Sequence, residues 1–157
     1  ANGKLTLSVP KQRKSSSKTI MKELQISYNS PWQELHWKSI NSAYRSSAYF
    51  EFYEDFFVSF YTKKEKYLFD FNLKLQKTVF KCLQIEDTSI LSNSYQKESK
   101  KIDLRKSVFR ISKPPQYRQV FESNCGFIAN LSIIDLLFNL GPESADYLLN
   151  LDTSSLI

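Results

Sequence analysis

The sequence predicts a helix-rich α+β fold: one domain with a small sheet. Two early segments alternate apolar and polar residues, as strands do, and apolar residues recur at helical spacing over long segments after residue 30. Only three glycines and five prolines interrupt the 157-residue chain, which favours long helices. This length suits one domain with a buried core. We expect the domain to cover residues 1–150 and residues 151–157 to be a frayed tail.

The two predicted strands lie close together in the sequence. Residues 5–9, LTLSV, alternate strictly and stop at Pro10. Residues 23–28, ELQISY, alternate again, so we expect them to pair with the first strand. Residues 11–18 between them carry four positive charges and no acid. A solvated loop is the simpler interpretation, and a basic loop that contacts phosphates is the alternative. Residues 88–95, TSILSNSY, are expected to form a third strand.

Helices are predicted from residue 31 onward. Ser30 with Gln33 forms a capping-box pattern around Pro31, which predicts a helix over residues 31–46. An aromatic stripe at helical spacing over residues 49–61 indicates core, and residues 63–84 read as the longest helix. Residues 113–115, KPP, require an extended connection. Asn130 is expected to cap a helix over residues 131–139, with Gly141 closing it and Pro142 starting another.

Composition narrows the classes of function. Lys and Arg outnumber Asp and Glu by 22 to 16, which suits an anionic partner. Two cysteines without metal-ligand spacing and a single histidine leave no basis for a zinc site, and we expect no metal or cofactor. GxGxxG, GxxxxGK[ST] and GxSxG are all absent from the sequence. No apolar run is long enough for a membrane span, and no signal peptide is present, so we expect a cytoplasmic protein with free thiols.

His36 is the first candidate for a catalytic residue. It is the only histidine and lies between the two tryptophans, Trp32 and Trp37. Its imidazole is the one side chain here that exchanges protons near neutral pH without a large pKa shift, so it is a candidate general base. The alternative is a packed histidine with one ring nitrogen hydrogen-bonded.

Asp135 is the second candidate. Apolar residues surround it in the predicted helix LSIIDLLFNL, and a buried carboxylate requires a partner. Arg105, Arg118 and His36 are the candidate partners, in a structural ion pair or in a functional site. Gln119 is a candidate to bind a ligand hydroxyl. Asn130, Ser132 and Asn139 have helix-end explanations, although a helix N-terminus can also bind an anion.

The order of these motifs resembles the bacterial WbqC-like family. The resemblance rests on PWQELHWKSINSAY at residues 31–44, DLR at 103–105 and NLSIIDLLFNLGPE at 130–143, and it extends from Gly3 to Leu149. The start that is usual in the family has no counterpart here, so we expect the chain to lack an N-terminal segment. Ala129 stands where the family pattern has proline, and the connection from Pro115 to Tyr117 is short.

The resemblance implies a cytoplasmic protein of surface-polysaccharide (O-antigen) gene clusters. Some members have been suggested to transfer an acyl or aminoacyl group to an amino sugar. The positions that match the family's recurrent residues are Trp32, His36, Tyr44, Asp103, Arg105, Gln119, Asn130, Ser132, Asp135 and Asn139.

From the residues and the resemblance we expect a transferase acting on a nucleotide-activated amino sugar. His36 would be the general base, with Asp135 orienting it or binding substrate. Arg105 and the 11–18 loop would hold a diphosphate, and Trp32 and Tyr44 would pack against a ring. The rival hypothesis is a non-catalytic scaffold of the same pathway, which leaves peripheral membrane contact open. RNA binding is a third and weaker interpretation, because the aromatic residues follow core periodicity instead of alternating with Lys and Arg.

Overall fold

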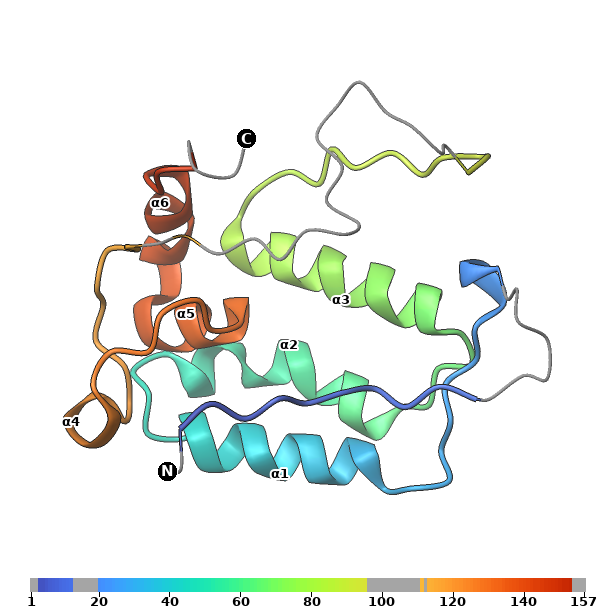
Figure 1. Ribbon diagram of the computed structural model, residues 1–157, viewed down its shortest axis with the longest axis horizontal. Coiled ribbons are helices and arrows are strands. Elements are labelled where there is room, and N and C mark those ends of the chain that lie inside the picture. Colours follow the sequence, from blue (N-terminus) through green and yellow to red (C-terminus); the bar gives the residue numbers. More distant parts are fainter. Residues whose placement is uncertain (1–2, 13–19, 96–110, 112, 154–157) are drawn as a thin grey trace.

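The computed structural model describes residues 3–12, 20–95, 111 and 113–153 (Figure 1). A 3₁₀ turn η1 (Met21–Glu23) precedes three helices: α1 (Trp32–Tyr44), α2 (Phe50–Thr62) and α3 (Leu68–Leu83). The C-terminal part holds α4 (Glu122–Cys125), α5 (Ile133–Leu140), η2 (Gly141–Glu143) and α6 (Ser144–Leu149). Residues 154–157 of the expected tail, and residues 13–18 of the basic loop, fall outside the described residues.

The predicted small sheet is wrong for the described part of the chain, which contains no strand. Residues 5–9 are extended but pair with nothing along their length. Two isolated antiparallel bridges remain, Lys11 with Ile26 and Gln25 with Tyr67. The segment around Ile26 therefore makes backbone hydrogen bonds to two neighbours. Ser27 N donates to Pro10 O at 2.8 Å, and Ile26 N donates to Lys66 O, in the connection before α3, at 3.0 Å. Residues 88–95 form no strand either.

Alternation predicts an extended backbone, but a sheet also needs a neighbouring extended segment in register. Helices occupy that neighbouring space here: in Figure 1 the N-terminal segment (residues 3–9) runs across the helical layer alongside α1. The fold is thus helical over the described residues, and the α+β class is corrected to an all-helical one there.

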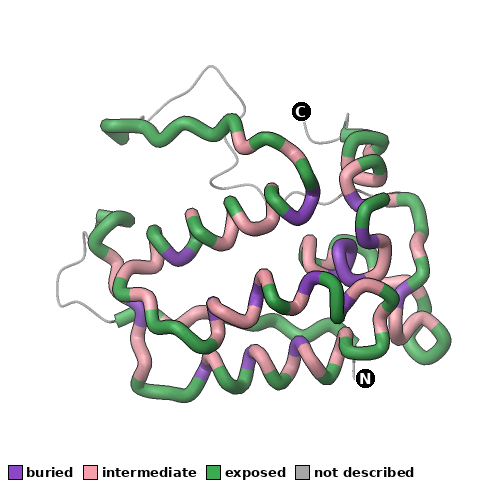
Figure 2. Tube along the Cα trace, turned by 180° about the vertical axis from the view of Figure 1, so that it is seen from behind, coloured by how far each residue is buried: buried purple, intermediate pink, exposed green. Residues whose placement is uncertain are grey.

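The core lies where α1, α2, α3 and α5 meet. Figure 2 shows the buried positions on the inward faces of these helices. Phe138 of α5 is fully buried and contacts the rings of Tyr44, Phe50 and Phe57 at centroid distances of 5.2, 5.1 and 5.8 Å. The aromatic stripe of residues 49–61 therefore serves as core, which follows from its helical spacing.

The helix starts differ in detail from the predicted caps. At α1, Pro31 is the N-cap and no side chain caps the helix. Gln33 instead donates to the carbonyl oxygens of Phe60 and Lys63, both at 2.8 Å, and so ties α1 to the end of α2. Asn130 does not cap α5, whose N-cap residue is Ser132. The Asn130 side chain instead bonds to the backbone of Ile111: its Oδ1 accepts from Ile111 N at 3.1 Å, and its Nδ2 donates to Ile111 O at 3.0 Å.

Gly141 ends α5 as predicted. Its φ of +58° lies in the left-handed region, which favours glycine. A Cβ atom there would lie 2.5 Å from Cδ1 of Tyr49, so the close approach of this ring also requires glycine. The tight turn leads through Pro142 into η2 and α6, and it fixes α5 against the N-terminus of α2.

Candidate functional site

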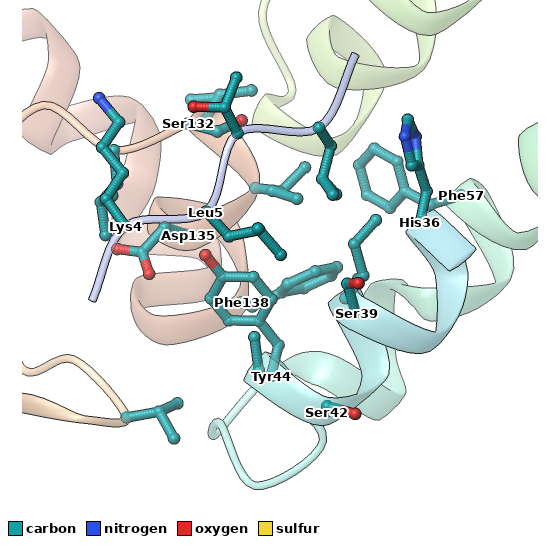
Figure 3. Close-up of a pocket in the computed structure, with 18 of the residues that line it drawn as sticks. Lys4, Leu5, His36, Ser39, Ser42, Tyr44, Phe57, Ser132, Asp135 and Phe138 are labelled. Atoms are coloured by element: carbon teal, nitrogen blue, oxygen red, sulfur yellow. The ribbon is translucent and has the colours of Figure 1, made fainter. Parts of the chain in front are cut away.

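An open cleft of about 1270 Å³ runs between the N-terminal segment, the helices α1, α2, α3 and α5, and the loop around residues 119–132. Figure 3 shows part of its lining, with Leu5 crossing it. Seven of the residues predicted for the site line this cleft: Trp32, His36, Tyr44, Gln119, Asn130, Ser132 and Asp135. Asn139 lies behind it, against Asp135. Asp103 and Arg105 lie outside the described residues.

Asp135 is buried at one end of the cleft and is hydrogen-bonded by uncharged groups. Its side chain is 3% exposed. The Tyr117 hydroxyl and the Gln119 amide donate to Oδ2 at 2.5 and 3.1 Å. The Asn139 amide donates to Oδ1 at 3.4 Å and to the Asp135 carbonyl at 2.7 Å. The Tyr44 hydroxyl lies on the cleft side of the same carboxylate (Figure 3).

The two tyrosines beside Asp135 are proton donors at neutral pH. Burial raises the pKa of Tyr117 far above its usual range, and the hydrogen bond to the Asp135 carboxylate and its charge raise it further. Burial also raises the pKa of Tyr44, and the charge of Asp135 adds to the effect. Both phenols therefore keep their protons, and Tyr44 can present a hydroxyl to a ligand in the cleft.

Of the expected partners of Asp135, neither Arg118 nor His36 pairs with it among the described residues, and Arg105 lies outside them. Residues 114–119 run without regular structure, so Tyr117 and Gln119 lie on one side while Arg118 between them is exposed. Arg118 makes no ion pair with Asp135 in the described part of the chain. Gln119 is held by a second pair of bonds, accepting from Ile128 N at 2.8 Å and donating to Ile128 O at 3.0 Å.

His36 is buried among aromatic rings at the other end of the cleft. It is 8% exposed, and its ring lies edge-on to Trp32 at 5.1 Å and to Tyr61 at 6.3 Å. Burial lowers the pKa of His36, because desolvation disfavours the imidazolium. The imidazole is therefore neutral at neutral pH and can accept a proton. Trp37 lies on another face of α1 and stacks on Tyr61 at 5.3 Å.

His36 and Asp135 line the same cleft but form no dyad. Tyr44 reaches the Asp135 end from a position eight residues after His36 on α1. At 1.5 Å per residue this places the two ends about 12 Å apart along the helix. Figure 3 shows the imidazole and the carboxylate on opposite sides of the view. No hydrogen bond joins His36 and Asp135 among the described residues, and whether Asp135 orients His36 or binds substrate stays a prediction.

Sequence reasoning missed three parts of the site: Tyr117, which donates to Asp135, and Tyr61 and the N-terminal segment, which line the cleft. Tyr117 could have been found from its i, i+2 relation to Gln119 after the two prolines. Tyr61 carries no such signal, since it belongs to an aromatic stripe that is otherwise core. The alternation in the N-terminal segment predicts a strand, and it carries no indication of a cleft.

We find no metal centre in the described residues, where no three His, Cys, Asp or Glu side chains gather. None of the helices in that part of the chain has both the length and the apolar character that a membrane span requires.

Comparison with known proteins gives one result. Curated proteins and solved structures give no significant match. The family model described as "WbqC-like protein family" matches residues 1–113 and 101–147, which together cover most of the chain. The chain belongs to the WbqC-like family.

Proposed function

We propose that this protein is a transferase of surface-polysaccharide synthesis that acts on a nucleotide-activated amino sugar, adding an acyl or aminoacyl group to the amine. The main observation in support is that residues from distant parts of the sequence, including His36 and Asp135, line one cleft. Membership of the WbqC-like family supports the pathway.

The polar end of the cleft (Tyr44, Gln119, Asn130, Ser132 and Asp135) would bind the sugar. Tyr44 offers a hydroxyl there, and Ser132 is exposed before the N-terminus of α5. Sugar rings carry hydroxyls that need directional donors and acceptors, and several such groups gather at this end. Asp135 would act through the groups it holds, because protein donors already occupy both of its oxygens.

His36 would be the general base at the other end of the site. Its neutral imidazole would take the proton from the sugar amine as the nitrogen attacks the acyl carbon. The separation of about 12 Å between the two ends accommodates a sugar ring bound at the polar end with its amine directed toward His36. Asp103 and Arg105 remain proposed contacts for the diphosphate.

A binding or scaffold protein without catalysis is the second candidate. The observation that favours it is the Asp135 network, which Tyr117, Gln119 and Asn139 satisfy without a ligand. A purely structural role would give Asp135 the same bonds.

A transfer assay separates the two candidates. The full chain is incubated with a UDP-linked amino sugar and an activated acyl donor, and amide formation is followed by mass spectrometry. We expect product with the wild type and none with His36→Gln, whose melting temperature should stay close to that of the wild type. Glu34→Gln, a change at an exposed position of the same helix outside the cleft lining, is the matched control and should retain activity. Absence of product with any donor, together with tight binding of the nucleotide sugar, would favour the scaffold.

A further inference from the structure

The aromatic end of the cleft differs in chemistry from the polar end. Three helices supply its lining, which consists of Trp32, His36, Tyr61, Phe71 and Leu75. Trp32 and Phe71 pack edge to face with centroids 6.0 Å apart. None of these side chains carries a fixed charge. Such a lining favours an uncharged, apolar part of a ligand.

The N-terminal segment forms the opposite wall and leaves apolar surface in water. Leu5 and Leu7 both line the cleft, yet they are 67% and 37% exposed. In the part of the chain that the structure describes, backbone hydrogen bonds hold this segment only from Pro10 onward, where Ser27 N donates to Pro10 O at 2.8 Å. Leu5 lies beside Tyr44 and Asp135 at the polar end (Figure 3), so an apolar chain bound at the aromatic end would cover Leu7, which is favourable because its surface leaves water.

Trp32 supplies a second, independent observation. Its Nε1 is the only buried side-chain nitrogen or oxygen among the described residues that has no hydrogen-bond partner. Buried donors are normally paired, so this one calls for an acceptor. His36 lies one turn further along α1, with its ring 5.1 Å from the indole. A carbonyl oxygen of a ligand at this end would be such an acceptor.

We propose that the aromatic end binds the apolar chain of an acyl thioester, the acyl donor, between the helices and the N-terminal segment. This inference rests on the proposed function and names the class of its donor. The polar end is unsuited to such a chain, because its exposed polar side chains, Asn130 and Ser132, would lose water without replacement.

The reaction at the junction of the two ends is then an aminolysis. The sugar amine attacks the thioester carbonyl carbon, forming the C–N bond, and the C–S bond breaks. His36 takes the proton that the nitrogen loses and returns it to the leaving thiolate. The products are an N-acyl sugar and a free thiol, and neither an oxidant nor a reductant is needed.

A chain-length series tests the donor class directly. Acetyl-, butyryl-, hexanoyl- and octanoyl-pantetheine are titrated into the full chain by calorimetry. Each added methylene should tighten binding by roughly threefold to fourfold while the cleft has room for it. Affinity that does not change with chain length would overturn the inference, as would tighter binding of glycyl-pantetheine than of octanoyl-pantetheine.

Two variants locate the chain. Leu75→Trp should fill the aromatic end and weaken octanoyl-pantetheine binding by about tenfold or more, while acetyl-pantetheine binding changes little. Lys77→Trp, on the exposed side of the same helix, is the matched control and should bind as the wild type does. If Leu75→Trp unfolds, Leu7→Ser in the N-terminal segment provides the test, since its half-exposed site tolerates the change. It should reduce the gain per methylene, and an unchanged gain would overturn the inference.

The same titrations keep this inference apart from the proposed function. Binding of a UDP-linked amino sugar tests the polar end, and the chain-length gain tests the aromatic end. If glycyl-pantetheine gives the amide and affinity does not increase with acyl-chain length, the transferase function is supported and the apolar acyl donor is rejected. A chain-length gain without any transfer would keep the acyl site and reject the reaction.

Discussion

The two ends of the cleft solve the burial of a polar group in opposite ways. At the polar end Asp135 is 3% exposed and accepts hydrogen bonds from Tyr117, Gln119 and Asn139. At the aromatic end His36 is 8% exposed and contacts the rings of Trp32 and Tyr61. Among the described residues, neutral donors bond the buried carboxylate. Burial lowers the pKa of His36, so the imidazole stays neutral and no charge is buried at that end.

This difference assigns a mainly structural role to Asp135 and a mainly chemical role to His36. A group with all its bonds made is expensive to remove and has little capacity left for a ligand. A buried neutral imidazole costs little to replace but keeps a free proton-accepting function. We therefore expect changes at the polar end to affect stability first and changes at the aromatic end to affect reaction first.

The largest effect is expected for Asp135→Ala. Removing the carboxylate leaves the Tyr117 hydroxyl without its acceptor and takes one of two acceptors from each of the Gln119 and Asn139 amides, and each lost acceptor costs about 1–3 kcal/mol. The free energy of unfolding, from urea denaturation, should therefore fall by at least about 3 kcal/mol. Asp135→Asn retains one acceptor oxygen and should lose less. A loss below about 1 kcal/mol for Asp135→Ala would show that the network contributes little, and the contrast between the ends would fail.

Matched Tyr→Phe changes sharpen the contrast. Tyr117→Phe removes a 2.5 Å hydrogen bond to a buried carboxylate and should cost about 1.5–3 kcal/mol of unfolding free energy. Tyr61→Phe removes a hydroxyl whose pKa burial raises to about 12, with no hydrogen bond recorded for it among the described residues. It should cost less than about 1 kcal/mol. Equal losses in the two variants would contradict the assignment of the network to one end.

The smallest effect concerns pH and His36. Its folded-state pKa lies below the unfolded value, so the unfolded chain binds a proton more readily as the pH falls. The stabilisation is thus fully present above the unfolded pKa of about 6.5 and is lost as the pH drops below it. Urea midpoints at pH 7.5 and 5.5 should differ less for His36→Gln than for the wild type. Identical differences would mean that His36 does not contribute.

Local patterns predicted the helices well and the sheet badly. The spacing of aromatic residues over 49–61 predicts α2 because it fixes a buried face, and Gly141 predicts the end of α5 because few other residues adopt its conformation. Residues 5–9 alternate equally clearly, but their pairing depends on which segments come to lie beside them. That information is not local.

The candidate site shows the same limit. His36 and Asp135 stand out from their chemistry alone, and both line the cleft. Their separation follows from the number of α1 turns between His36 and Tyr44 and from the packing of Tyr44 beside α5. The donors to Asp135 include Tyr117 and Gln119. Both belong to a segment without regular structure, whose position depends on the whole fold. The expectation of Arg or His as partner follows from charge, whereas the donors to Asp135 among the described residues are neutral.

Calorimetric titration of a UDP-linked amino sugar into the wild type, His36→Gln and Asp135→Asn tests the division of the cleft most directly. We predict that Asp135→Asn weakens binding by about tenfold or more, because the groups that contact the sugar lose their support. His36→Gln should change the Kd by less than about threefold while abolishing transfer. Equal binding by wild type and folded Asp135→Asn, or loss of sugar binding in His36→Gln alone, would contradict the account.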